Sequence, residues 1–294
     1  MKFVKVMKAG GFLLAVALLF VLCDVLFGRS TWIRDSGFFP LNDFEITQRA
    51  HPEKTWDRVV YGSSELTSCY REDLSKTHYV NLGMDYATIV DLDKMLRRGC
   101  IRIGEELVIA CNWGLLCDTL DTNPTYPWLR GTLEPHFYFQ RDRLGPFIQD
   151  TWKYLLHDGE PRERVWLEQQ KELYHGNMSH QELSERVVSL NERFFADGLN
   201  GFMDNLAALP HVFEWCRSHD IAVRVLWLPE NPAAPLGDTD DALRAAVAEL
   251  CAADDVDYTD LTDALSADCF YDTGHIDYEH GAVVFTEVFD EWAS

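Results

Sequence analysis

Residues 57–66 read DRVVYGSSEL, and this stretch decides the fold class. Its apolar centre predicts a short buried strand, and the glycine and serines that follow predict a turn into a helix. Two further apolar runs, at residues 78–83 and 106–112, also end in a glycine or a polar residue. Residues 86–98 lie between them and show apolar positions at helical spacing. Strands that alternate with helices predict parallel βαβ units.

The same alternation continues in the second half of the chain. We expect strands at 221–229 and 256–260 and helices at 201–218, 239–252 and 281–292. The sequence therefore predicts an α/β fold with a parallel sheet of about five strands and helices on both faces. Right-handed crossovers place the carboxyl ends of such strands along one edge, where open α/β sheets bind ligands.

The composition and the net charge limit the classes of protein to which this chain can belong. The 294 residues are 47% hydrophobic and 13% aromatic, which is enough for one large domain with a buried core. The formal net charge is −22, and no basic stripe offers a nucleic-acid surface. One interpretation of the negative charge is that it keeps the protein soluble or adapts it to a salty environment. The alternative is that it binds a cationic substrate or partner. The eight cysteines form no C-x-x-C pair, so we expect no metal site and no cofactor.

The N-terminal segment predicts a membrane anchor. Residues 10–27 read GGFLLAVALLFVLCDVLF and are apolar except for Asp24. As a helix, about 18 residues span roughly 27 Å, close to the hydrocarbon thickness of a bilayer. Lys2, Lys5 and Lys8 precede the run, which indicates that the short N-terminus stays cytoplasmic and that the rest lies outside.

The residues that end the apolar run are bulky, unlike those of a signal-peptidase site, so an uncleaved anchor is favoured over a signal peptide or a buried core helix. The predicted organisation is a cytoplasmic tip and transmembrane anchor over 1–28, a stem over 29–55, and an α/β domain over 56–294. The protein would then be a single-pass protein of the cell membrane with an extracytoplasmic C-terminal domain.

A long segment at about 113–200 interrupts the α/β pattern. It is polar and rich in aromatic residues, and helices are expected at 163–174 and 179–195. Two interpretations stay open: a lid or partner-docking surface, and an insertion that only packs on the sheet edge.

Two short motifs suggest nucleophilic catalysis. Ser64 follows a predicted strand and precedes a predicted helix, so its hydroxyl would lie near free N–H groups that favour negative charge. Asp272 precedes His275 by three residues, close enough to bind ring Nδ1 and leave Nε2 to take the serine proton. Alone, each motif could be an ordinary turn. Together they predict a Ser-His-Asp triad.

Acyl transfer also needs hydrogen-bond donors aimed at the tetrahedral oxygen. The backbone N–H groups of Ser64 and Gly83 and the side-chain amide of Asn112 could converge there, since each follows a predicted strand. The alternatives are a strand-end turn for Gly83 and a helix cap for Asn112.

The order of these motifs resembles that of the SGNH (GDSL-like) hydrolase superfamily. Gly-x-Ser lies at 62–64, Asn-x-Gly at 81–83, an asparagine at 112, and Asp-x-x-His at 272–275. The chain departs from the family pattern at Ser63, where the family has aspartate. It also departs in the third block, which reads Gly-x-Asn-Asp in the family: here Ala110 and Trp113 stand in place of the glycine and the aspartate.

The resemblance implies a three-layer flavodoxin-like fold and a role for each matched residue. Ser64 would be the nucleophile, His275 the base, and Asp272 the residue that orients it. Ser64, Gly83 and Asn112 would form the oxyanion hole.

Within the superfamily, the motif Gly-Ser-Ser-Glu-Leu at 62–66 and the apolar N-terminus resemble those of the DltD-type proteins of teichoic-acid D-alanylation. Related anchored proteins act in the O-acetylation of cell-surface polysaccharides. The resemblance implies an extracytoplasmic serine esterase or acyltransferase that acts on acyl esters of cell-envelope glycans or teichoic-type polymers. Its substrate would be an acylated glycan or polyol. The alternative is a catalytically inactive SGNH-like domain that binds envelope polymer or docks on a membrane-bound O-acyltransferase. A third interpretation is an unrelated α/β binding protein.

Overall fold

The computed structural model describes residues 2–28, 41–120, 122–123, 125–129, 148, 151–152, 155–156 and 173–294. The chain divides into two compact units. One unit contains residues 43–123 and 170–294 and carries the sheet, and the other contains residues 1–42 and 124–169.

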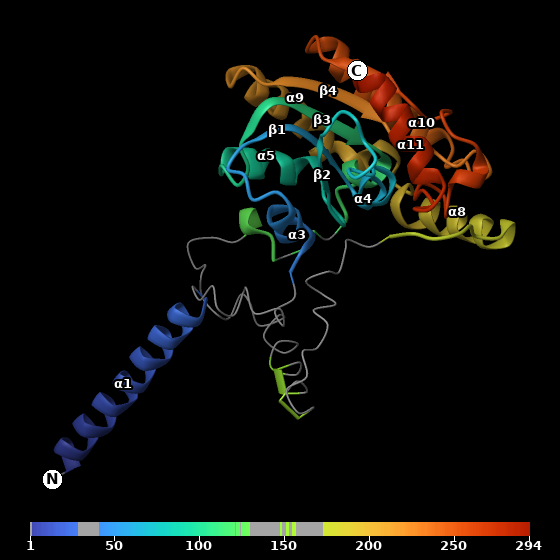
Figure 1. Cartoon of the computed structure of the whole chain (residues 1–294). Helices are drawn as coiled ribbons and strands as arrows, with labels where there is room; N and C mark the ends of the chain where they lie inside the picture. Colours follow the sequence, from blue (N-terminus) through green and yellow to red (C-terminus); the bar gives the residue numbers. More distant parts are fainter. Residues whose placement is uncertain are drawn as a thin grey trace. The chain divides into compact units, whose positions relative to one another are not determined.

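The sheet has five parallel strands in the order β2-β1-β3-β4-β5 (Figure 1). The strands are β1 (Trp56–Gly62), β2 (Val80–Gly83), β3 (Ile103–Cys111), β4 (Ala222–Trp227) and β5 (Asp257–Asp260). The structure confirms the predicted α/β fold with its parallel sheet of about five strands, and the strand order is consistent with a flavodoxin-like fold.

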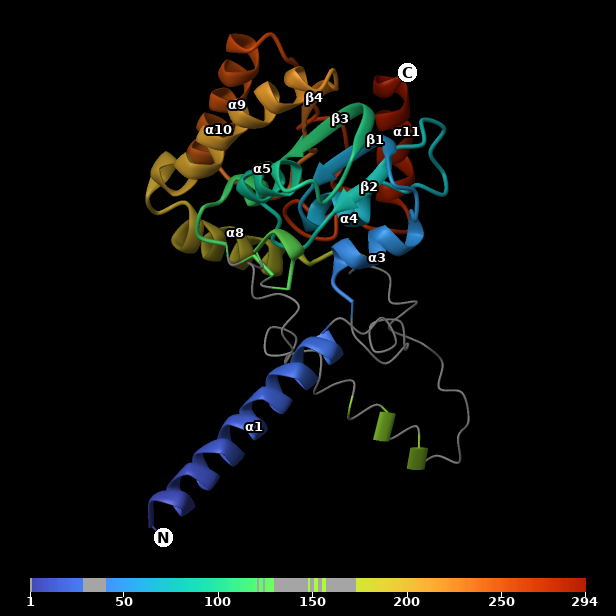
Figure 2. The same cartoon turned by 90° about the vertical axis from the view of Figure 1, so that its left-hand side faces the viewer.

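Helices cover both faces of this sheet. The covering helices are α4 (Ser64–Cys69), α5 (Ile89–Arg97), α9 (Met203–Ser218), α10 (Asp238–Ala253) and α11 (Gly281–Ala293). Helix α4 packs against α11, while α5 packs against α9. Figure 2 shows α9 and α10 on one side of the sheet and α11 on the other. These helices occupy the ranges that the apolar spacing predicts, except α4, which is too short to show a period.

The core lies between the strands and their helices. From Val59 onward β1 is buried, because both of its faces are covered. On the α11 side, Val60 and Val108 meet Phe285 and Phe289 in one apolar cluster. Burying a large apolar side chain stabilises the fold by roughly 1.5–3 kcal/mol. The cluster therefore fixes α11, and with it the loop that precedes α11, against the sheet.

The N-terminal prediction is met in part. A helix, α1 (Lys2–Gly28), covers the predicted anchor. In the described ranges, no helix is both long and apolar enough to span a bilayer. The membrane span therefore stays a prediction. Within the expected stem, α3 (Asp43–Ala50) packs against β2 and buries Phe44.

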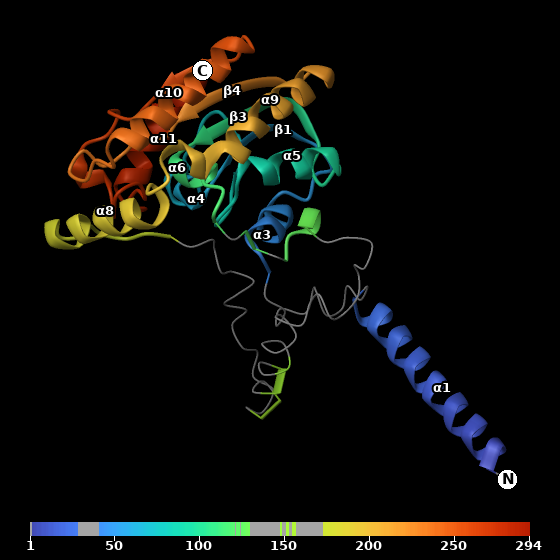
Figure 3. The ribbon, with the colours of Figure 1, turned by 180° about the vertical axis from the view of Figure 1, so that it is seen from behind.

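The segment at 113–200 contains four described helical elements. They are α6 (Trp113–Leu116), η1 (Pro127–Leu129), α8 (His180–Phe194) and η3 (Gly198–Phe202). The helix expected at 179–195 is present as α8, which lies outside the sheet and its two helical layers (Figure 3). The helix expected at 163–174 falls on residues of which all but the last two lie outside the described ranges. A short helix, η4 (Ala267–Cys269), precedes the loop that carries Asp272.

Candidate active site

The turn between β1 and α4 places Ser64 at the first position of a helix. Ser63 caps α4, and its hydroxyl accepts the N–H of Glu65 at 3.4 Å. A Cβ on Gly62 would lie 2.7 Å from Leu66 Cβ, so only glycine permits this close approach of strand and helix. The backbone N–H of Ser64 has no acceptor within its own helix. The turn therefore fixes both the hydroxyl and one N–H donor of Ser64.

Ser64, His275 and Asp272 form a hydrogen-bonded chain. Ser64 Oγ lies 2.9 Å from His275 Nε2. On the other side of the ring, His275 Nδ1 lies 3.0 Å from Asp272 Oδ2 and 3.1 Å from Oδ1. An ionised carboxylate only accepts, so Nδ1–H donates to Asp272 and Nε2 is left to accept the proton of the serine. Residues 211 positions apart thus meet with the geometry of a nucleophile and its base.

The loop that carries Asp272 is held by the backbone and by one asparagine. Asp272 Oδ1 accepts the backbone N–H groups of Gly274 at 3.1 Å and His275 at 2.8 Å. The buried Asn231 donates its side-chain amide to the Asp272 carbonyl at 2.8 Å and its backbone N–H to the Thr273 carbonyl at 3.1 Å. The carboxylate is therefore aimed at the ring by contacts that do not involve Ser64.

The electrostatics of the site favour a charged aspartate beside a basic imidazole. Burial alone would raise the pKa of Asp272, but the hydrogen bond and charge of His275 and the charge of Arg186 outweigh it and lower that pKa. Burial alone would lower the pKa of His275, but the hydrogen bond and charge of Asp272, together with Glu65, outweigh it and raise that pKa. The ring is thus a stronger base than an ordinary imidazole.

A second buried carboxyl lies beside the triad. A Cβ on Gly274 would collide with the carboxyl of Glu65, so this side chain lies directly against the triad loop. Burial raises the pKa of Glu65 to about 7, although the charge of His275 and a hydrogen bond from Asn112 lower it in part. Glu65 therefore changes its charge near neutral pH, next to His275.

Gly83 and Asn112 lie on either side of the Ser64 turn, and their donors are engaged within the protein. Gly83 pairs with Gly62 across the sheet and donates its N–H to Asn81 Oδ1 at 2.9 Å. The side chain of Asn112 caps α6 and donates to Ser63 Oγ at 2.9 Å. An oxyanion role for these two residues stays a prediction.

Two residues in the C-terminal half of the 113–200 segment reach Asp272 and His275, and the sequence interpretation missed both. Arg186 Nη2 lies 2.9 Å from Asp272 Oδ2. The ring of Tyr174, which lies in the segment's C-terminal half, packs against that of His275 with centroids 3.9 Å apart. A basic residue between Leu183 and Leu190 on the apolar face of a helix was the signal that could have indicated Arg186.

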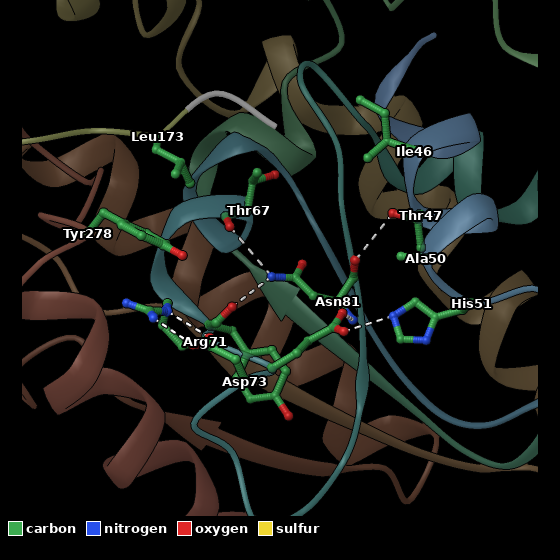
Figure 4. A pocket seen from close by; sticks show the side chains of 12 residues that line it. Ile46, Thr47, Ala50, His51, Thr67, Arg71, Asp73, Asn81, Leu173 and Tyr278 are labelled. Carbon is green, nitrogen blue, oxygen red and sulfur yellow. Dashed lines mark hydrogen bonds and ion pairs between the residues drawn. The ribbon is translucent and has the colours of Figure 1, made fainter. Parts of the chain in front are cut away.

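A cavity of about 520 Å³ lies along α4, the helix that carries Ser64. Thr67, three residues after Ser64, and Tyr278, three residues after His275, both line it. Figure 4 shows Leu173, Tyr278 and Arg71 along one side and residues of α3 along the other. Its volume lies in the range of small-ligand pockets. Neither Ser64 nor His275 lines it, so the cavity is a neighbouring hollow along α4 and does not open on the Ser64 hydroxyl.

Among the described side chains, no three His, Cys, Asp or Glu residues are arranged to hold a metal ion. No protein-family model matches the sequence, and a comparison with curated proteins finds no relative.

Proposed function

We propose that the chain is an SGNH-type serine esterase or acyltransferase that acts on acyl esters of cell-envelope glycans or teichoic-type polymers. One observation supports this most strongly: Ser64 Oγ lies 2.9 Å from His275 Nε2, and a buried aspartate holds the other ring nitrogen. In a Ser-His-Asp triad, nucleophilic catalysis uses this hydrogen-bonded arrangement of nucleophile, base and orienting acid.

In the proposed reaction, His275 Nε2 takes the hydroxyl proton while Ser64 Oγ attacks the ester carbonyl carbon. The tetrahedral intermediate collapses, the C–O bond to the alcohol breaks, and the imidazolium returns its proton to the leaving oxygen. The acyl-enzyme then passes its acyl group to water in an esterase, or to a sugar or polyol hydroxyl in a transferase. Asp272 stays ionised and stabilises the imidazolium in both steps.

The oxyanion would be held first by the backbone N–H of Ser64, which has no helical acceptor. Gly83 and Asn112 would join it only if each exchanged its present partner for the substrate oxygen, because they donate to Asn81 and Ser63. Because both donors are already hydrogen-bonded within the protein, the structure also offers support for a second candidate. This candidate is a catalytically inactive domain that binds envelope polymer or docks on a membrane-bound O-acyltransferase. Turnover of p-nitrophenyl acetate that disappears in His275→Ala would exclude that candidate.

We include in the proposal that α1 anchors the protein in the cell membrane, with the α/β domain outside the cytoplasm. Phe12, Leu18 and Phe20 on α1 are each more than half exposed. A helix that is apolar on all sides is buried in protein or in lipid. Such an anchor would keep the domain near acylated polymers of the envelope.

The test is covalent labelling of the full-length protein with a fluorophosphonate, a probe that reacts with activated serines. We expect Ser64→Ala to abolish labelling and to lower ester turnover by about 10⁴–10⁶-fold. Ser218→Ala is the control, because it removes an exposed hydroxyl at the end of α9, outside the triad, and should leave labelling in place. Folded wild-type protein that takes up no probe, or labelling that survives in Ser64→Ala, would contradict the proposal.

A further inference from the structure

Helix α8 presents a cation on its buried face. Ser179 caps the helix, and Glu182 completes a capping box with it. Leu183 and Leu190 are the buried residues of α8, seven positions apart, and Arg186 lies between them at helical spacing on the same side. The Arg186 side chain is 40% exposed, so it reaches inward from this side of the helix while part of it stays in contact with solvent. Its partner is the carboxylate of the triad.

Hydrogen bonds attach residues 174–178, just before α8, to the loop that carries Asp272 and His275. Tyr174 accepts the N–H of Tyr278 through its carbonyl at 2.8 Å, and Met178 donates its N–H to the Tyr271 carbonyl at 2.8 Å. The side chain of Asn177 donates to the Phe270 carbonyl at 2.7 Å. These bonds lie on both sides of Asp272 in sequence. They hold the beginning of α8 in register with the catalytic loop.

The carboxylate of Asp272 is fully buried, and its two oxygens have different partners. Oδ1 accepts two backbone N–H groups of its own loop. Oδ2 is shared between His275 Nδ1 at 3.0 Å and Arg186 Nη2 at 2.9 Å. Without Arg186, the imidazole would be the only described partner of Oδ2, although a carboxylate oxygen has about two acceptor positions.

We infer that Arg186 is a positioning residue of the active site, which fixes the Asp272 carboxylate so that His275 points at Ser64. The inference rests on the proposed function. It assigns a role to the C-terminal part of the segment that interrupts the α/β pattern: residues 173–194 complete the triad from outside the sheet.

Arg186 also sets how basic the imidazole is. The charged groups that face His275 are Asp272 and Glu65, which raise its pKa, and Arg186, which lowers it. The phenol of Tyr174 packs on the ring. Removing the positive charge of Arg186 therefore raises the pKa of His275, and the ring stays protonated, and unable to act as a base, up to a higher pH.

The experiment compares Arg186→Lys, Arg186→Gln and Arg186→Ala in the full-length protein, with turnover of p-nitrophenyl acetate measured from pH 5.5 to 9. We expect a kcat loss of roughly 10- to 100-fold for the glutamine and alanine variants, the range for losing a charge-assisted hydrogen bond. KM should change little, because Arg186 does not touch the substrate. The acid limb of kcat/KM should move to higher pH, and lysine should restore both properties in part.

Arg193→Ala is the matched control, because it removes a positive charge from an exposed residue two turns after Arg186 on the same helix. It should leave kcat and the pH profile unchanged. A wild-type profile in Arg186→Ala would overturn the inference.

The titration of the His275 ring, followed by NMR in wild type and Arg186→Gln, gives a readout that does not depend on turnover. An unchanged midpoint would also overturn the inference. A shifted midpoint in a protein that neither reacts with fluorophosphonate nor hydrolyses ester would support the positioning and refute the proposed function. The two failures are thus distinguishable.

Discussion

Glu65→Gln replaces the buried carboxyl that lies against Gly274 with a neutral amide of nearly the same shape. Burial raises the pKa of Glu65 from 4.5 to about 7 in the folded protein. A raised folded-state pKa gives stability that is fully present below the unfolded value and is lost as the pH rises through the folded value. The stability that protonated Glu65 contributes is therefore lost between about pH 4.5 and about pH 7.

The magnitude follows from the width of that window. At about 1.36 kcal/mol for each pKa unit, a shift of about 2.5 units is worth roughly 3 kcal/mol. The wild type should lose this much unfolding free energy between pH 4.5 and 7.5 through Glu65. The glutamine variant has no proton to lose at this position. The difference in stability between variant and wild type should therefore rise by about 3 kcal/mol in favour of the variant.

The assay is urea unfolding of both full-length proteins at half-unit steps from pH 4.5 to 8.5. Subtracting the two curves cancels the titrating groups that do not interact with Glu65, and leaves the contribution of Glu65 together with that of His275, whose pKa Glu65 raises. Glu214→Gln, on the exposed side of α9, is the control for replacing one carboxyl with an amide at the surface. A difference for Glu65→Gln that stays flat, or that falls as the pH rises, would refute the reasoning that burial holds the proton on this carboxyl.

Two further substitutions test the packing around the site. Gly83→Ala should destabilise the protein by about 1–3 kcal/mol in urea unfolding, because its Cβ would lie 2.6 Å from the backbone nitrogen of Thr67, which cannot move aside. An unchanged unfolding midpoint would contradict this close contact. Asn231→Ala removes a buried donor from the triad loop and should slow fluorophosphonate labelling by about tenfold. Labelling at the wild-type rate would show that the loop holds its shape without that donor.

Much of the fold could be predicted, because the buried strands correspond to runs of apolar residues in the sequence. The runs at 57–61 and 106–112 correspond to β1 and β3, the central strands, which are covered on both faces. Helix α3 could not be distinguished from a stem, since only Phe44 and Thr47 of its eight residues are buried. Helix α6 has four residues, too few to show a helical period.

The site was predictable where its geometry is local. Asp272 and His275 contact each other within one loop, so their spacing already indicates the pair. The partner of Arg186 lies 86 positions away and depends on how α8 docks, which no local pattern specifies. The donation from Gly83 to Asn81 was also hidden, because the Asn-x-Gly spacing does not show that the Asn81 side chain turns back to accept the Gly83 N–H.

The 211 positions between the reactive hydroxyl and its base have a consequence for biosynthesis. A ribosome adds about 5–20 residues per second, so the serine is made roughly 10–40 seconds before the histidine. During that interval the Ser64 hydroxyl has no imidazole beside it. Under the proposed function, the growing chain therefore gains its nucleophile and base as a pair only when the loop of Asp272 and His275 docks on the sheet.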